Sequence, residues 1–333
     1  MSGKLRNTLL IPPVYFSIMR NINKQKKFIR THFENILINF ESSNDGSLST
    51  KDFIKIRKYY GLAVPAILGE AFSNLRGYPL TFQERYVNTN MGVITGIFDD
   101  FFDNARLTND YIKRMVEKPE SIIPSTSNEK LFIDFYLSAL ERSSFPHLVK
   151  KYALIVTANQ IDSVEQEGTG ISYDRIWEIT KDKGGSSVLF YRSGLDNELN
   201  VEEEETLFQL GSLMQLENDI FDTYKDSQDN ILTIPTTIKN IQSLRNLYQE
   251  QVQLFIKLSY NMPYSRKKIM RFLDKIMPVI NRGFVCLDQY QKLEDINNGV
   301  FDISVYSRKQ LICDMEAPGN IVRTIYYQII STY

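Results

Sequence analysis

Apolar residues recur at helical spacing along almost the whole chain, and this periodicity constrains the fold more than any other feature. No segment of any length alternates apolar and polar residues as a half-buried strand does, and there is no glycine-rich nucleotide loop. Proline and glycine are sparse, at 11 and 16 of 333 residues, and neither an internal repeat nor a low-complexity linker divides the chain. The sequence therefore predicts an all-α fold, organised as a single helical domain over residues 1–333.

Charge and the rarer residue types narrow the functional classes. The chain carries 39 basic and 40 acidic residues, a net charge of −1, so no overall field favours nucleic acid or an anionic membrane as a partner. Its two cysteines and two histidines stand in no metal-ligand or catalytic arrangement, which gives little support to zinc or Ser-His-Asp chemistry. No run of about 18 apolar residues occurs, so no membrane span is expected. These features predict a soluble cytoplasmic protein.

Three aspartates gather within five residues, among apolar and aromatic side chains. Asp99, Asp100 and Asp103 fall near the end of a helix that the pattern predicts to run from Thr81 through Phe102. In a helix, Asp103 follows Asp99 by four residues and Asp100 by three, so all three carboxylates would converge on one point. Carboxylates this close repel one another. A ligand set made only of oxygen suits a hard cation such as Mg²⁺, which shares its shell with water and phosphate oxygens.

A second stripe of oxygen ligands begins 119 residues after the first, counted from 99 to 218. Asn218, Asp222 and Asp226 are spaced four residues apart, which places them on one face of a predicted helix that begins after Asn200. The first turn of this helix, residues 202–205, is all glutamate, at the end of a helix that favours negative charge. Two such stripes on facing helices would hold Mg²⁺ ions around a diphosphate, polarising its oxygens and neutralising the leaving group.

The helix expected between the two acidic stripes contains a pair of glycines, Gly184 and Gly185. Each costs about 1 kcal/mol relative to alanine in a helix. The pair therefore predicts either a break in the helix or a close approach of its backbone to a ligand. Lys183, next to the pair, and Arg175, two turns earlier, are candidates for binding phosphate, with Arg192 as a third.

These motifs resemble those of the class I isoprenoid synthase superfamily, which comprises all-α terpene cyclases, prenyl diphosphate synthases, and squalene and phytoene synthases. Residues 99–103, Asp-Asp-Phe-Phe-Asp, match the aspartate-rich motif DDxxD. Residues 218–226 resemble the cyclase motif NDxx(S/T)xxxE, with aspartate in place of the hydroxyl residue at Asp222 and of the final glutamate at Asp226. The order and spacing of the motifs, with a Lys-Gly-Gly segment between them, cover residues 51–234 or so.

The resemblance implies a terpene synthase, a carbon–oxygen lyase, built as a single-domain helical bundle around a central active-site cavity. Its substrate would be a prenyl diphosphate, farnesyl or geranylgeranyl diphosphate, ionised with about three Mg²⁺ ions or with Mn²⁺ in their place. The catalytic metal ligands would be Asp99, Asp100, Asp103, Asn218, Asp222 and Asp226. Lys183 and Arg175 would bind the substrate diphosphate. A homodimer is expected from the resemblance only.

Aromatic side chains are the natural surroundings of a carbocation, which needs π-faces nearby and water kept out. The chain has 20 phenylalanines, 19 tyrosines and one tryptophan, so candidates are plentiful. Each of them also suits an ordinary hydrophobic core. The aromatic residues nearest the motifs are Phe98, Phe101, Phe102, Trp177, Phe190 and Phe221.

Other reactions of the superfamily, and two non-catalytic roles, stay open. Chain elongation is disfavoured, because the second cluster lacks an adjacent aspartate pair and residues 57–62 lack the Gly-Lys-Arg triplet of elongating synthases. Head-to-head condensation is the runner-up, because the second cluster also fits the squalene and phytoene synthase pattern QxxNxxxDxxxD, beginning at Gln215. A non-catalytic prenyl synthase-like partner subunit would have lost ligands. The thermal stability of a helical scaffold with incidental acidic clusters would not depend on metal.

Overall fold

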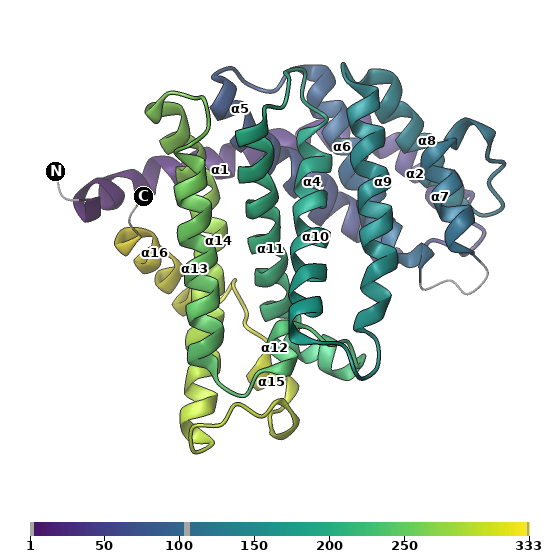
Figure 1. Ribbon diagram of the computed structural model, residues 1–333. Coiled ribbons are helices and arrows are strands. Elements are labelled where there is room, and N and C mark those ends of the chain that lie inside the picture. The colour runs from purple at the N-terminus through teal and green to yellow at the C-terminus, as the bar shows by residue number, and fades with distance from the viewer. Residues whose placement is uncertain (1–2, 103–106, 332) are drawn as a thin grey trace. The chain divides into compact units, whose positions relative to one another are not determined.

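The computed structural model describes residues 3–102, 107–331 and 333. The predicted all-α fold is confirmed: the described residues form helices joined by loops, with no strand beyond one isolated bridge between Glu167 and Ile231 (Figure 1). Among these residues, none of the helices combines the length and the apolar character needed to cross a bilayer.

The chain divides into two compact units, each named here after its central helix. The α6 unit comprises Tyr15–Ile161 and Leu189–Leu199, and the α11 unit comprises Met1–Val14, Asp162–Val188 and Asn200–Tyr333. Three helices contribute residues to both units: α1, α10 and, by its last residue Asp162 alone, α9. The single domain over residues 1–333 stays a prediction.

The α6 unit is built around α6 (Phe82–Phe98), most of whose residues are buried. Thr81 begins this helix with a capping box, in which its side chain accepts a hydrogen bond from the Glu84 amide and the Glu84 carboxylate accepts one from the Thr81 amide. Helix α8 and the segment from η1 to η2 pack against α6. The elements of this unit are α1 (Gly3–His32, from Tyr15), α2 (Glu34–Ser42), α3 (Thr50–Ile54), η1 (Lys55–Tyr60), α4 (Gly61–Ala63), η2 (Val64–Gly69), α5 (Glu70–Arg76), α6, η3 (Asp99–Phe101), α7 (Asn109–Glu117), η4 (Pro119–Ser121), α8 (Ser127–Arg142) and α9 (Pro146–Asp162).

Two π-helical segments, η1 and η2, lie on either side of α4, and η2 contains Pro65. A proline inside a helix removes one backbone donor and crowds the preceding turn, and a widened turn accommodates it. The segment also lies very close to α6: a Cβ atom added at Gly92 would overlap the carbonyl group of Tyr60. The glycine therefore lets the two backbones touch.

The α11 unit is built around α11 (Val201–Gln228), which packs against α13 and α14. Asn200 caps α11 as predicted, because its side chain accepts a hydrogen bond from the Glu203 amide at 2.8 Å. The elements of this unit are the first residues of α1, η5 (Ser163–Gln166), α10 (Tyr173–Arg192, to Val188), α11, α12 (Ile234–Thr237), α13 (Ile241–Ser259), α14 (Arg266–Ile296), η6 (Ile303–Val305), α15 (Arg308–Leu311) and α16 (Pro318–Ile330).

The helix break expected at Gly184 and Gly185 is wrong, because α10 runs without interruption from Tyr173 to Arg192. The glycines serve a contact with α11 instead. A Cβ atom at Gly184 would overlap the carbonyl oxygen of Gly211, and one at Gly185 would overlap the Phe208 ring. The absence of side chains here lets α10 and α11 lie backbone to backbone, side by side in Figure 1.

Candidate functional site

The first acidic cluster lies at the C-terminal end of α6. The helix ends at Phe98 and tightens into the 3₁₀ turn η3, in which the Phe102 amide donates to the Asp99 carbonyl at 3.0 Å. The regular α-helix predicted through Phe102 is therefore shorter than expected, since helix ends commonly tighten in this way. Asp103 lies outside the described residues, so its spacing relative to Asp99 and Asp100 stays a prediction.

A lysine that the sequence analysis missed contacts this cluster. The Lys55 ammonium lies 3.6 Å from the Asp100 carboxylate and 3.3 Å from that of Asp52. Asp99 is exposed and Asp100 is half-buried. Burial raises the pKa of Asp100, and the charge of Lys55 opposes that rise only in part. Lys55 comes from η1, far from Asp100 in sequence, and no local spacing signals the pair.

The second acidic cluster runs along one face of α11, and its members become more buried along the chain. Asn218 is exposed, Asp222 is half-buried and Asp226 is buried. The Asn218 amide donates to the Asp222 carboxylate at 3.3 Å. The pKa of Asp226 is raised to about 7, first by burial and then by the negative charges of Asp219 and Asp222. Asn218, Asp219, Asp222 and Asp226 of α11 therefore form one cluster, in which three of the four side chains are acids.

Asp219 belongs to this cluster, although the sequence analysis did not include it among the ligands. Its buried carboxylate accepts hydrogen bonds from Gln215 at 2.8 Å and from the Thr180 hydroxyl at 3.2 Å. Burial raises its pKa to about 6, and the positive charge of Lys183 acts against that rise. The spacing of Gln215 and Asp219 was visible in the sequence. The contact from Thr180, on α10, depends on the glycine-mediated packing of the two helices.

The two cations predicted to bind diphosphate lie in different surroundings along α10. Lys183 is half-buried and is close enough to Asp219 for its charge to affect that carboxylate. Arg175 lies about 12 Å away along the helix axis. Its guanidinium pairs with Glu165 at 2.7 Å, with Glu178 at 3.0 Å and with Asp162 at 3.4 Å. Of the two residues, Lys183 is the one that the structure brings to the acidic cluster.

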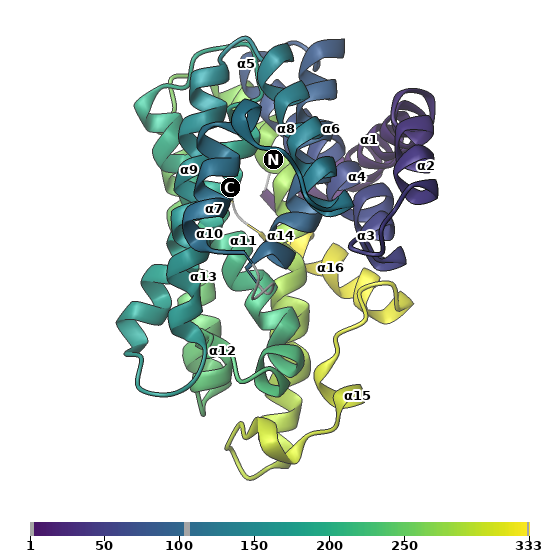
Figure 2. The ribbon, with the colours of Figure 1, turned by 90° about the vertical axis from the view of Figure 1, so that its right-hand side faces the viewer.

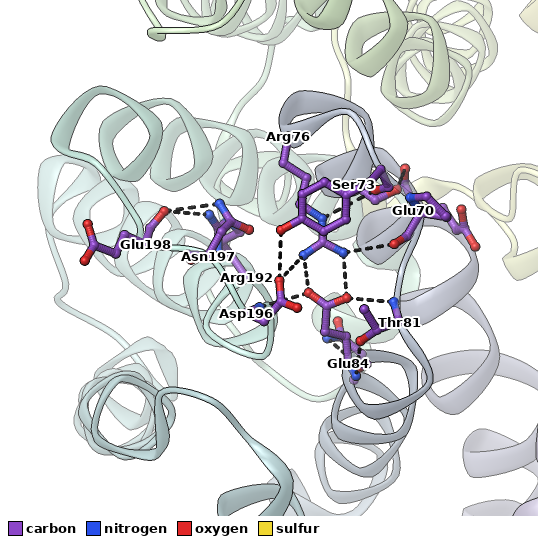
Figure 3. A network of polar contacts seen from close by, with 12 residues as sticks. Glu70, Ser73, Arg76, Thr81, Glu84, Arg192, Asp196, Asn197 and Glu198 are labelled. Carbon is purple, nitrogen blue, oxygen red and sulfur yellow. Dashed lines mark hydrogen bonds and ion pairs between the residues drawn. The ribbon is translucent and has the colours of Figure 1, made fainter.

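Arg192, the third candidate cation, is buried within the α6 unit. Its guanidinium donates to the backbone carbonyls of Asn197 and Glu198, at 3.2 and 3.1 Å (Figure 3). Both carbonyls belong to the loop that follows α10, residues 193–200, which also contains Asp196. These contacts give Arg192 a structural role in holding that loop.

A second charged network in the α6 unit surrounds the start of α6 (Figure 3). The Arg76 guanidinium is buried, pairs with Glu84 and lies 2.7 Å from Asp196. Glu84 also accepts from the amides of Thr81 at 2.7 Å and Asp196 at 2.9 Å. Burial alone would raise the pKa of Glu84, but the hydrogen bonds from Arg76 and from the amides of Asp196 and Thr81 together lower it to about 2. These partners join α5, α6 and the loop after α10.

The aromatic residues of the first motif pack into the core of the α6 unit. The rings of Phe98 and Phe132 stack at 5.4 Å, and Phe101 meets Phe132 edge-on at the same distance. Phe101 is only 1% exposed. In the α11 unit, the Lys181 ammonium lies over the ring of Trp177, and the Arg282 guanidinium lies over the ring of Phe221. The faces of Phe98 and Phe101 are therefore occupied by core packing.

The donor chemistry of both clusters suits a hard divalent cation. Each offers carboxylate oxygens, and α11 adds the amide oxygen of Asn218. Within the part of the chain that the structure describes, no group of three or more His, Cys, Asp or Glu side chains is arranged to hold a metal ion. A cation at either cluster would therefore complete its shell with water and substrate oxygens, as Mg²⁺ usually does. Such a cation would also relieve the repulsion among the acids of α11.

Comparison with known proteins assigns neither a family nor an activity. No family model and no curated protein matches the chain. Among solved structures, a dehydrosqualene synthase in complex with a ligand aligns with 95% of this chain and 97% of its own, at 13% sequence identity and a TM-score of 0.43.

Proposed function

We propose that this protein is a Mg²⁺-dependent class I terpene synthase that ionises and cyclises a prenyl diphosphate, either farnesyl or geranylgeranyl diphosphate. The observation that best supports the proposal is the acidic cluster on α11. Burial, together with the negative charges of Asp219 and Asp222, raises the pKa of Asp226 to about 7, and the charge of Lys183 on α10 acts on Asp219. Several carboxylates close to a lysine offer ligands for metal ions and a partner for the diphosphate that the metal ions would bind.

Each residue of the proposed site has a separate role. Asp99, Asp100 and Asp103 would bind metal from the end of α6. Asn218, Asp222 and Asp226 would bind it from α11, while Asp219 would keep Gln215 and Lys183 in place through its contacts and charge. Lys183, and Arg175 if it leaves its acidic partners, would hold the diphosphate. When bound, Mg²⁺ polarises phosphoryl oxygens and neutralises the leaving diphosphate.

Head-to-head condensation of two prenyl diphosphates is the second candidate. The observation in its favour is Gln215, the first residue of the squalene and phytoene synthase pattern. Its side chain is engaged in the acidic cluster of α11, where it donates to Asp219. The two reactions share the metal ligands and differ in the number of substrates, so the products distinguish them.

Metal and diphosphate binding tests the site without requiring the correct hydrocarbon substrate. We expect Mg²⁺ together with inorganic diphosphate to raise the melting temperature of the protein, and the rise to be lost in Asp99→Ala and Asn218→Ala. The matched controls are exposed aspartates in the same two units, Asp134→Ala on α8 and Asp229→Ala at the end of α11. A full rise in both site variants would remove the proposed site.

A further inference from the structure

One face of α1 within the α6 unit is exposed and carries an unusual set of side chains. Phe16 is 71% exposed and Met19 is 55% exposed. They are followed, at helical spacing, by the exposed Arg20 and Lys27. The name α1 face is used here for seven exposed residues of α1 after Tyr15: Phe16, Met19, Arg20, Asn23, Lys24, Lys27 and Arg30.

The opposite side of the same helix is fixed in the core of the α6 unit. Phe28 and Ile29 are buried, and so is Gln25. The Gln25 amide donates to the Gly61 carbonyl and to the Thr89 hydroxyl, each at 2.9 Å. The α1 face is therefore presented by an anchored helix, which is drawn in purple beside α2 in Figure 2. Its exposed apolar residues do not contribute to that core.

The charge of α1 departs from that of the rest of the chain. Residues 1–33 contain seven lysines and arginines and no aspartate or glutamate. This leaves 32 of the 39 basic residues to be set against all 40 acidic ones in the remainder. The net charge of −1 therefore conceals a basic segment on an acidic protein. Among the described residues, the basic side chains of the α1 face form one ion pair, between Lys24 and Glu70 at 3.7 Å.

We propose that the α1 face docks the protein on the surface of an anionic lipid bilayer. Phe16 and Met19 would enter the boundary between headgroups and acyl chains, where large apolar side chains of surface helices lie. Arg20, Lys24 and Lys27 would face the anionic headgroups, and each such side chain strengthens binding by about fivefold. A nucleic acid would use the basic residues but would leave Phe16 and Met19 without a function. The combination therefore favours a lipid surface.

Flotation of the full-length protein with lipid vesicles tests this proposal. We expect the protein to float with vesicles of equal parts phosphatidylcholine and phosphatidylserine, and at least tenfold less with phosphatidylcholine alone. High salt should weaken the binding, because it screens the exposed charges. Absence of flotation with the mixed vesicles would overturn the proposal, as would binding to a DNA or RNA duplex without vesicle binding.

Substitutions distinguish the α1 face from the rest of the surface. Arg20→Gln together with Lys27→Gln should weaken vesicle binding by about 25-fold, as expected for two independent contributions. The control is Lys113→Gln together with Lys118→Gln, two exposed lysines of the same unit, which should bind as the parent protein does. Parent-like binding by the Arg20 and Lys27 variant would contradict the proposal.

The apolar contribution has its own pair of variants. Phe16→Ser should weaken binding at least fivefold even at high salt. The control is Ile123→Ser, at a residue of the same unit that is 90% exposed, and it should have no effect. Equal losses in the two variants would contradict the proposed insertion of the α1 face. Unchanged circular dichroism and melting temperature would establish that all variants are folded.

Discussion

Lys55 lies between two carboxylates, one of which, Asp100, belongs to the first acidic cluster. Its ammonium is 3.3 Å from Asp52 and 3.6 Å from Asp100, and its side chain is 39% exposed. In the proposed enzyme, a metal ion that binds Asp100 would compete with this ammonium. Lys55 would therefore weaken the binding of metal in the absence of substrate.

Removal of the Lys55 charge tests this competition. We expect Lys55→Met to bind Mg²⁺ alone roughly fivefold more tightly, which corresponds to the ~1 kcal/mol of a partly exposed ion pair. Lys55→Arg keeps the charge and should bind Mg²⁺ as the parent protein does. Isothermal titration calorimetry of both variants measures the difference, and weaker binding by Lys55→Met would show that the ammonium does not compete.

Glu84 gives a prediction about stability and pH. Its pKa lies at about 2, below the ordinary value of 4.5, because of the hydrogen bond from Arg76 and the amides of Thr81 and Asp196. A depressed pKa means that the carboxylate stabilises the fold above pH 4.5 or so, and that this contribution is lost as the pH falls through about 2. We expect Glu84→Gln to lower the free energy of unfolding by about 3 kcal/mol at neutral pH, because it leaves a buried guanidinium poorly compensated.

Urea denaturation at several pH values measures this contribution. The difference between the parent protein and Glu84→Gln should shrink as the pH falls below 4.5. Glu117→Gln, at an exposed glutamate of the same unit, should leave the free energy of unfolding nearly unchanged at neutral pH. A difference between the parent and Glu84→Gln that is constant down to pH 2 would contradict the lowered pKa of Glu84.

At the scale of the elements, the contact between α10 and α11 places Lys183 and Thr180 beside the acidic cluster. Gly184 and Gly211 form the contact, and each would have its Cβ atom overlap the other's carbonyl group. Backbone atoms cannot move aside as a flexible side chain can. The distance between the two helices, and with it the hydrogen bond from Thr180 to Asp219, therefore depends on both glycines.

Alanine substitutions test the importance of this contact. We expect Gly184→Ala to lower the free energy of unfolding by about 3 kcal/mol, since overpacking against backbone forces the helices apart. Gly319→Ala is the matched control, because a Cβ atom there meets no atom within 4 Å and α16 should gain helix propensity. Urea denaturation of the two variants gives the comparison. Equal stability of both would mean that α10 and α11 do not depend on this close contact.

The sequence predicted the features of these elements that depend on local spacing. The stripe from Asn218 to Asp226 and the cap at Asn200 follow from helical periodicity and capping chemistry, and both are present. The role of Gly184 was not predictable, because it depends on a partner glycine in another helix. Lys55 was missed for the same reason, since its contact with Asp100 arises only from tertiary packing.

At the scale of the whole molecule, the net charge conceals an uneven distribution of charge along the chain. A net charge of −1 indicated no overall field towards nucleic acid or an anionic membrane. The excess of positive charge in residues 1–33 is nevertheless a local property that a sum over the chain conceals. The structure adds that several of these basic side chains lie on the exposed side of α1, opposite its buried side. The all-α fold, in contrast, follows from a pattern present along the entire chain.

Incubation of the purified protein with geranyl, farnesyl and geranylgeranyl diphosphate, one at a time, tests the proposed reaction most directly. Products are analysed with and without Mg²⁺. The proposal predicts a hydrocarbon or alcohol that forms only with Mg²⁺ and keeps the carbon number of its substrate, and predicts its loss in Asn218→Ala. A product with twice the carbon number would assign head-to-head condensation instead. If none of the three substrates gives a product in the presence of Mg²⁺, the proposed terpene synthase activity is contradicted.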